Sequence, residues 1–190
     1  MSAIPGQLLP MIHRVRTAAV QAPPAPWQWR AVHAVGGLTE VGFGRGTDLL
    51  LVVSHDGRGV FDCLTGLRVA RDPTMPEPGE ADWQDTHELD AEGIGPLAGQ
   101  TVRTSGLAGG GLALATADGW TAERLVLDWP EESLLLVPPG AWIYETRAGR
   151  SAAFTKIAVE NEPRAWGFSP TGRSLVLATS SDVTIFGRRA

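Results

Sequence analysis

Cysteine, lysine and long apolar runs are scarce in this 190-residue sequence, and each scarcity excludes a class of protein. Cys63 is the only cysteine, so no internal disulfide can form, and this fits a reducing, cytoplasmic location. No apolar run approaches the roughly 20 residues that a membrane helix needs. The N-terminus lacks the basic start and apolar core of a signal peptide. We therefore expect a cytoplasmic protein with no membrane partner.

Positive charge is also limited in this sequence. The formal net charge is -5, the pI is about 5.3, and lysine and arginine form no cluster, which argues against a nucleic-acid partner. Lys156 is the only lysine, and arginine with many alanine, glycine and proline residues is typical of GC-rich bacterial coding. Charged residues at 19% are ordinary for a folded protein. Residues 1–190 are long enough to bury one core, which predicts a single domain.

The strongest pattern in the sequence is an internal repeat. The stretch WGFSPTGRSLVLATSSDVTIFG, residues 166–187, aligns with VGFGRGTDLLLVVSHDGRGVFD, residues 41–62, and the phenylalanines of the two copies match. LALATADGW, residues 112–120, provides a third copy, because its LALAT matches LVLAT at 175–179. The sequence therefore predicts repeats centred near residues 38–71, 97–138 and 163–190.

Each repeat combines short strands with tight turns. Proline and glycine at 169–172 are typical of a type I turn, and Asp-Gly at 56–57 and 118–119 provides the positive φ of a tight hairpin. The strands at 49–53 and 175–178 are apolar on both faces, which indicates burial on both faces. Four short antiparallel strands with a buried inner strand describe a propeller blade. We expect an all-β fold with three propeller-blade-like repeats of antiparallel strands.

The third repeat ends without a fourth strand, and the N-terminal region can provide one. GQLLPMI at 6–12 resembles SLLLVPP at 133–139, the expected fourth strand of the middle repeat. A sheet edge that stays open favours aggregation, so pairing with this segment would protect it. We predict that residues 1–36 close the last repeat.

Two short stretches carry a family resemblance. FSPTG at 168–172 and VFDCLTG at 60–66 resemble the inner turn and the following strand of WD40 and related β-propeller proteins, with Phe61-Asp62 in place of the usual Trp-Asp. The resemblance implies a protein-binding scaffold. Three repeats are fewer than the about four to eight blades of most propellers. A small or incomplete propeller, a homodimer that completes a ring, a β-trefoil and another two-sheet all-β arrangement all fit this count.

No segment has the pattern of a catalytic site. Ser54-His55-Asp56 resembles a triad in sequence, but neighbouring strand residues point to opposite faces, so we interpret it as a turn. Gly109-Gly110-Gly111 precedes a strand instead of the helix that a phosphate loop requires, and it is also interpreted as a turn. Cys63 has no basic neighbour to activate it. We predict a protein that is not an enzyme, without catalytic residues, metal or cofactor.

The predicted partner site combines acidic groups and tryptophans. Trp83, Asp85, His87 and Asp90 lie in the acidic, proline-rich segment 72–96, and Trp120 follows a turn. Tryptophan is enriched in binding hot spots, and an acidic surface attracts a basic partner. The sequence favours a protein-binding module, such as a small acidic bacterial inhibitor or immunity-type protein. The alternatives are a small-molecule or carbohydrate-binding protein, a hydrolase with its site at Asp85, His87 and Asp90, and a structural homo-oligomer.

Overall fold

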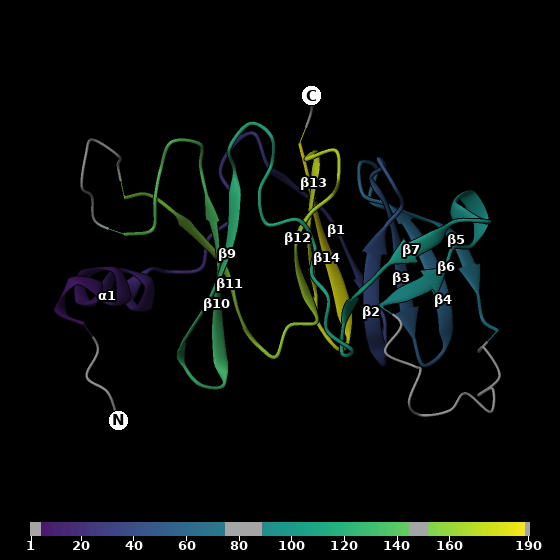
Figure 1. Ribbon diagram of the computed structural model, residues 1–190, viewed down its shortest axis with the longest axis horizontal. Helices are drawn as coiled ribbons and strands as arrows, with labels where there is room; N and C mark the ends of the chain where they lie inside the picture. The colour runs from purple at the N-terminus through teal and green to yellow at the C-terminus, as the bar shows by residue number, and fades with distance from the viewer. Residues whose placement is uncertain (1–4, 75–88, 145–151, 189–190) are drawn as a thin grey trace.

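Strands make up 50% and helices 9% of the protein, which confirms the predicted all-β class. The computed structural model describes residues 5–74, 89–144 and 152–188. Within these residues the strands form antiparallel sheets, and none of the sheets closes into a barrel or a propeller ring (Figure 1). A β-trefoil, which requires a closed barrel, therefore does not describe this fold.

Most of the strands belong to three sheets, called sheets 1, 2 and 3. Sheet 1 has the order β5 (Leu67–Asp72), β4 (Gly57–Asp62), β3 (Leu49–Ser54), β2 (Leu38–Phe43) and β8 (Ser105–Gly106). Sheet 2 has the order β11 (Thr155–Asn161), β10 (Glu131–Val137) and β9 (Thr121–Asp128). Sheet 3 has the order β1 (Gln28–Ala34), β14 (Asp182–Gly187), β13 (Ser174–Ala178) and β12 (Ala165–Phe168).

Sheet 3 lies between the other two sheets (Figure 1), and its strands β12, β13 and β14 contribute buried residues to the cores on both faces, whereas β1 is largely exposed. In β13, Val176 and Ala178 pack against sheet 1, whereas Leu175 and Leu177 pack against sheet 2. Successive side chains of a strand point to opposite faces, so a strand between two sheets needs apolar residues at every position. The SLVLA sequence of β13 meets this need, and all five of its residues are buried.

The outer faces of sheets 1 and 2 are covered by short additional elements. On sheet 2, α1 (Leu9–Thr17), which follows η1 (Gly6–Leu8), packs Met11, Ile12 and Val15 against Leu135 and Val137. On sheet 1, the cover consists of η2 (Gly95–Leu97), β6 (Asp90–Glu92) and β7 (Thr101–Arg103), and Leu97 and Val102 pack against Leu51 and Val60. The protein is thus a row of three sheets with a cap at each end, and β3 and β10 are apolar on both faces for the same reason as β13.

The N-terminal strand that completes sheet 3 is β1, which lies within residues 1–36. It pairs with β14 from Gln28 opposite Gly187 to Ala34 opposite Asp182. The prediction that residues 6–12 form this strand is wrong, because they belong to η1 and α1. Met11, Ile12 and Val15 have helical spacing, and proline is tolerated in the first helical turn, so the segment forms a helix with one apolar face.

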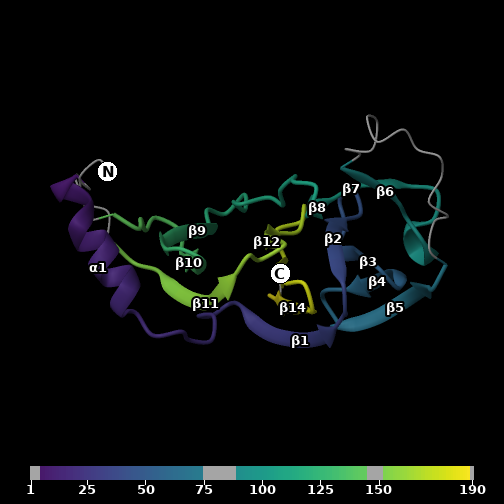
Figure 2. The ribbon, with the colours of Figure 1, turned by 90° about the horizontal axis from the view of Figure 1, so that it is seen from below.

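The predicted equivalence of LALAT and LVLAT is also wrong. LALAT, residues 112–116, is mostly exposed and makes only isolated bridges, from Ala113 to Phe168 and from Ala115 to Thr121. The buried strand of sheet 2 is β10, whose SLLLV matches the SLVLA of β13. Residues 105–116 cross the edges of all three sheets, and residues 18–34 follow the opposite edges (Figure 2).

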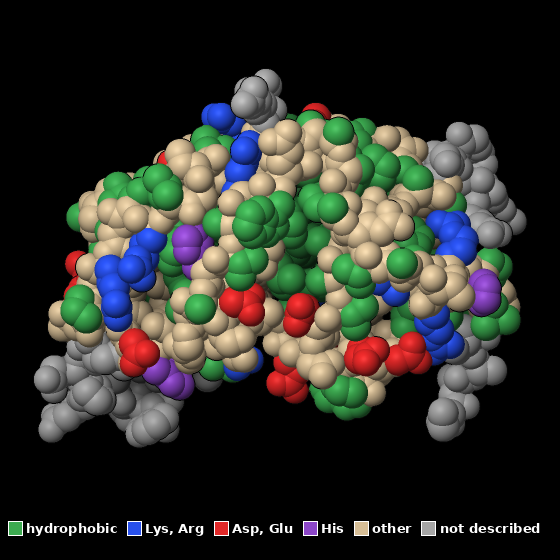
Figure 3. Space-filling model, turned by 180° about the vertical axis from the view of Figure 1, so that it is seen from behind, with side chains coloured by type: hydrophobic (Ala, Val, Ile, Leu, Met, Phe, Trp, Pro, Cys, Tyr) green, Lys and Arg blue, Asp and Glu red, His purple; other side chains and the backbone are tan. Residues whose placement is uncertain are grey.

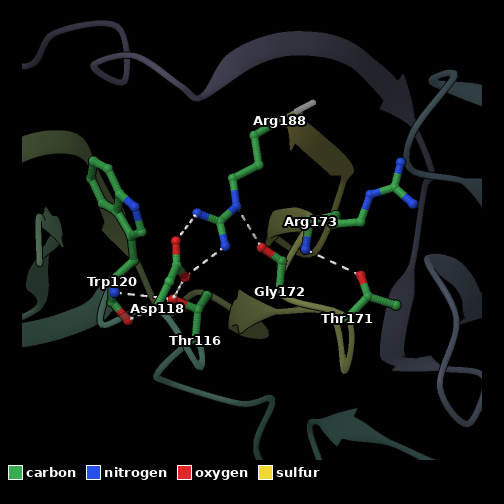
Figure 4. A network of polar contacts seen from close by, with 7 residues as sticks. All are labelled: Thr116, Asp118, Trp120, Thr171, Gly172, Arg173 and Arg188. Carbon is green, nitrogen blue, oxygen red and sulfur yellow. Dashed lines mark hydrogen bonds and ion pairs between the residues drawn. The ribbon is translucent and has the colours of Figure 1, made fainter. Parts of the chain in front are cut away.

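A polar network ties the turn before β9 to the end of sheet 3 (Figure 4). The Arg188 guanidinium donates to both carboxylate oxygens of Asp118, at 2.5 and 2.7 Å, and its Nε donates to the Gly172 carbonyl at 2.8 Å. Thr116 Oγ1 donates to Asp118 at 2.6 Å, and the guanidinium lies 4.8 Å from the Trp27 ring. The bonds from Arg188 and Thr116 hold the pKa of Asp118 well below its usual range.

Asp118→Asn is expected to lower the free energy of unfolding at neutral pH by about 0.5–1 kcal/mol, since the pair is half exposed to solvent. The pKa of Asp118 is lower in the folded state, so its stabilisation is complete above the unfolded pKa of about 4 and declines as the pH falls below it. Urea unfolding of wild type and variant at pH 7 and pH 3 measures this effect. A difference that is the same at both pH values would contradict it.

Candidate partner-binding face

Two of the five residues of the predicted partner site, Asp90 and Trp120, lie among the described residues, so the site as a whole stays a prediction. Trp83, Asp85 and His87 lie outside the described residues. Asp90 is in β6, with its carboxylate 3.7 Å from Arg103 Nη1. Trp120 is buried and packs edge-to-face on Trp27, with ring centroids 5.9 Å apart, so the expectation of an exposed Trp120 is wrong. It lies two residues before the buried Ala122 of β9 and points to the same face of the chain, toward sheet 3.

The best-defined surface feature is the free edge of sheet 3. β14 is the only neighbour of β1 within the described residues, so the other side of β1 is an open edge. Trp29 and Val32 of β1 are exposed by 60% and 50%. Natural sheet edges are usually protected by charges or proline, so an exposed tryptophan at an edge indicates a surface that another chain can cover.

A basic cleft lies on the side of β1 that faces sheet 1. Arg68 and Arg71 of β5 line one wall, the segment from Ala34 to Gly36 lines the other, and Val52 and Phe61 provide apolar contact. The cleft encloses about 180 Å³. Gly59 lies opposite Arg71 in the β4–β5 register, and its missing side chain leaves room between the strands.

The charges of this cleft are available for a ligand. Neither Arg68 nor Arg71 forms an ion pair within the described residues, whereas the neighbouring Arg58 binds Asp72 at 2.9 Å. Beside the cleft, His33 joins β1 to sheet 1. Its Nε2 lies 2.8 Å from the Gly66 carbonyl oxygen, and its ring centroid lies 4.5 Å from that of Phe61. The cleft therefore offers the unpaired cations of Arg68 and Arg71 beside an apolar surface, and its lining also includes the carboxylate of Asp56.

An acidic groove lies on the side of sheet 3 that faces sheet 2. It encloses about 340 Å³ and combines carboxylates with the hydroxyls of a turn; its lining includes Glu131, Glu160, Asp182, Thr179, Ser180 and Ser181. Burial, and then the charge of Asp182, raises the pKa of Glu160. None of the three carboxylates has an ion-pair partner among the described residues. Neighbouring carboxylates are stabilised in their charged form when a cation binds between them.

The cleft and the groove lie at the same end of sheet 3, on either side of it. Ala34 pairs with Asp182, and the Val35 N–H donates to the Ser181 carbonyl at 2.8 Å, so this strand end separates the two. Figure 3 shows this side of the molecule, with basic side chains gathered at the left over sheet 1 and acidic side chains at the lower centre. We call β1, the cleft and the groove together the β1 face.

The residues considered for catalysis occupy structural positions. Ser54 Oγ donates to the Gly57 carbonyl and accepts from the Asp56 N–H, as in a turn. Cys63 is buried, and this burial raises the pKa of its thiol well above the usual value, which makes it a poor nucleophile. In the described part of the chain, no three His, Cys, Asp or Glu side chains are grouped to hold a metal ion.

Comparison of the chain with family models, with curated proteins and with solved structures finds no match. Among residues 5–74, 89–144 and 152–188, no helix is long and apolar enough to cross a membrane.

Proposed function

We propose that this protein is a non-enzymatic protein-binding module and that the β1 face is its partner surface. The observation that carries the proposal is the open edge of β1, which exposes Trp29 near its start and Val32 further along, and which ends between two pockets of opposite charge. Aromatic residues and arginine are the side chains most enriched at interface centres. Opposite charges on either side of such a centre fix the orientation of a partner and reject partners with the wrong charge pattern.

The dimensions of the cleft favour a protein partner over a small ligand. Pockets for small molecules usually enclose about 300–1,000 Å³. The basic cleft encloses about 180 Å³, which suits a single aspartate or glutamate side chain. The acidic groove is in turn complementary to an arginine or lysine side chain. We therefore propose a partner that presents an acidic and a basic side chain on either side of an apolar contact with β1.

The net charge of -5 supports a basic partner, because long-range attraction accelerates the encounter. A small cytoplasmic bacterial inhibitor or immunity-type protein that sequesters a basic toxin or enzyme is one form of this proposal. We also propose that sheets 1 and 3 correspond to propeller blades, since β2 to β5 lie in consecutive order in sheet 1, and sheet 3 joins the consecutive strands β12 to β14 with β1 as a fourth antiparallel strand. The row would then be an open arc with capped ends instead of a closed WD40-like ring.

The test begins with capture of a stoichiometric partner from native lysate, followed by affinity measurements on purified proteins. Trp29→Ala is expected to weaken the complex by about thirtyfold, the effect of losing a hot-spot residue. The double variant Arg68→Glu, Arg71→Glu is expected to weaken it similarly and to reduce its dependence on salt. Leu107→Ala, at an exposed position on the opposite edge, is the matched control and is expected to bind like the wild type.

Unchanged affinity in both face variants would contradict the proposal, and so would loss of binding in Leu107→Ala alone. Absence of any stoichiometric partner would also count against it. Capture of a second copy of the same chain, supported by light scattering, would favour the homo-oligomer alternative.

A further inference from the structure

Residues 105–116 cross the sheet edges on the side of the molecule opposite β1 (Figure 2). A further cavity is lined by part of this segment. It encloses about 310 Å³, at the lower end of the usual range for small-molecule pockets of about 300–1,000 Å³. Its lining includes Ser105, Gly110, Leu114, Arg124, Arg164 and Trp166. The cavity shares no residue with the β1 face, so its function can be considered separately.

Two side chains that line this cavity contain buried donors without acceptors. The indole N–H of Trp166 is buried and has no hydrogen-bond partner, and the same is true of the Nε of Arg164. Arg164 forms no ion pair within the described residues, whereas Arg124 binds the buried carboxylate of Glu132. Nearly all buried donors in native proteins find a partner, so unpaired donors beside a cavity indicate a missing acceptor.

The glycine run adds backbone donors to the same cavity. Gly110 has φ of 81°, and a Cβ at this position would lie 2.3 Å from the Thr104 carbonyl oxygen, so only glycine allows this close approach. The N–H groups of Gly110 and Gly111 make no hydrogen bond within the described residues. The turn at this point spans Gly106 to Gly109, with the Gly109 N–H donating to the Gly106 carbonyl at 3.1 Å, so of the three predicted turn glycines only Gly109 belongs to it. Gly110 and Gly111 follow as irregular chain and line the cavity.

We propose that this cavity binds a small organic anion through Arg164, the Trp166 indole N–H and the backbone of Gly110 and Gly111. Among the described residues, no acidic side chain lines the cavity and no carboxylate forms an ion pair with Arg164. Leu112, Leu114 and Ala165 contact the remainder of the ligand, which is therefore apolar. The required chemistry is a phosphate or carboxylate group attached to a compact apolar body.

The test follows the indole N–H signals in ¹H–¹⁵N spectra during titration with phenyl phosphate and, separately, with benzoate. The signal missing from Trp166→Phe identifies Trp166. We expect this signal to move in a saturable way with at least one probe, because its N–H gains an acceptor. A stronger response to phenyl phosphate indicates a phosphate ester as ligand, and a stronger response to benzoate indicates a carboxylate.

Leu114→Glu introduces a negative charge at the cavity without disturbing the core, since Leu114 is 56% exposed. It is expected to weaken binding by about fivefold or more, the effect of one unit charge near the surface. Leu107→Glu is the matched control, with 59% exposure in the same segment but outside the cavity, and is expected to bind like the wild type.

Arg164→Gln is expected to weaken binding by about tenfold or more. Arg173→Gln, which changes another arginine with a buried unpaired Nε, is its control.

Failure of the Trp166 signal to move with either probe up to about 10 mM, a concentration that would detect even weak binding, would overturn the proposal. Equal weakening by Leu114→Glu and Leu107→Glu would overturn it as well, because the effect would then be general repulsion. Neither outcome bears on the β1 face, whose variants leave this cavity unchanged.

Discussion

Trp27→Ala is expected to lower the free energy of unfolding by about 3–5 kcal/mol, the largest effect of any single substitution considered. Trp27 is 2% exposed and lies between sheets 2 and 3. Its ring centroid is 5.9 Å from that of Trp120 and 5.4 Å from that of Phe168. Its loss leaves a cavity between two sheets whose strands are held from both faces and cannot collapse into it. It also removes the contact of Arg188 with the indole ring.

Trp29→Ala is the matched control for this prediction. Trp29 is the same residue type two positions away, but it is 60% exposed, so its replacement is expected to change stability by less than about 0.5 kcal/mol. Urea unfolding of both variants, followed by circular dichroism, measures the difference. Equal destabilisation of the two variants would contradict the packing of the N-terminal segment between sheets 2 and 3.

Asp48→Ala is expected to lower the free energy of unfolding by about 3 kcal/mol. Asp48 precedes β3 in sheet 1, is buried, and accepts hydrogen bonds from three hydroxyls of sheet 3 and its turn: Ser169 at 2.7 Å, Thr171 at 2.8 Å and Ser174 at 2.7 Å. The substitution removes the shared acceptor and leaves buried hydroxyl groups unpaired. A carboxylate that accepts several bonds is thus one polar link between sheets 1 and 3, beside the contact of His33 with the Gly66 carbonyl.

The control for Asp48 is Asp56→Ala, which removes an exposed carboxylate at a turn of the same sheet and is expected to have little effect. Denaturant unfolding of the two variants provides the comparison. If Asp48→Ala were as stable as Asp56→Ala, the hydroxyl cluster would make no net contribution to the contact between the sheets.

Much of the fold follows from local sequence patterns. LLLVV, SLLLV and SLVLA are apolar at successive positions, which predicts strands covered on both faces, and all three strands are covered in this way. LALAT misled because it has a similar apolar composition but lies on the surface across the sheet edges. The apolar residues in 6–12 also suggested a strand. The spacing of Met11, Ile12 and Val15 is instead that of one face of a helix.

The β1 face could not be predicted because its parts come from separate sheets. Glu131, Glu160 and Asp182 lie near three different strand ends, and only the packing of sheet 2 on sheet 3 brings them to one groove. The alternation rule would place Trp27 and Trp29 on the same face. Trp27 instead precedes β1, so the alternation rule does not apply to it; Trp27 is buried in the core, whereas Trp29 within the strand is exposed.

The most direct test of the proposed function is to find where the partner touches the protein. A photo-cross-linking amino acid at position 32 replaces an exposed valine of β1, and the same group at position 107 lies on the opposite edge. We predict that light joins the partner to the protein from position 32 and not from position 107. Cross-linking from position 107 alone would contradict the assignment of the β1 face as the partner surface.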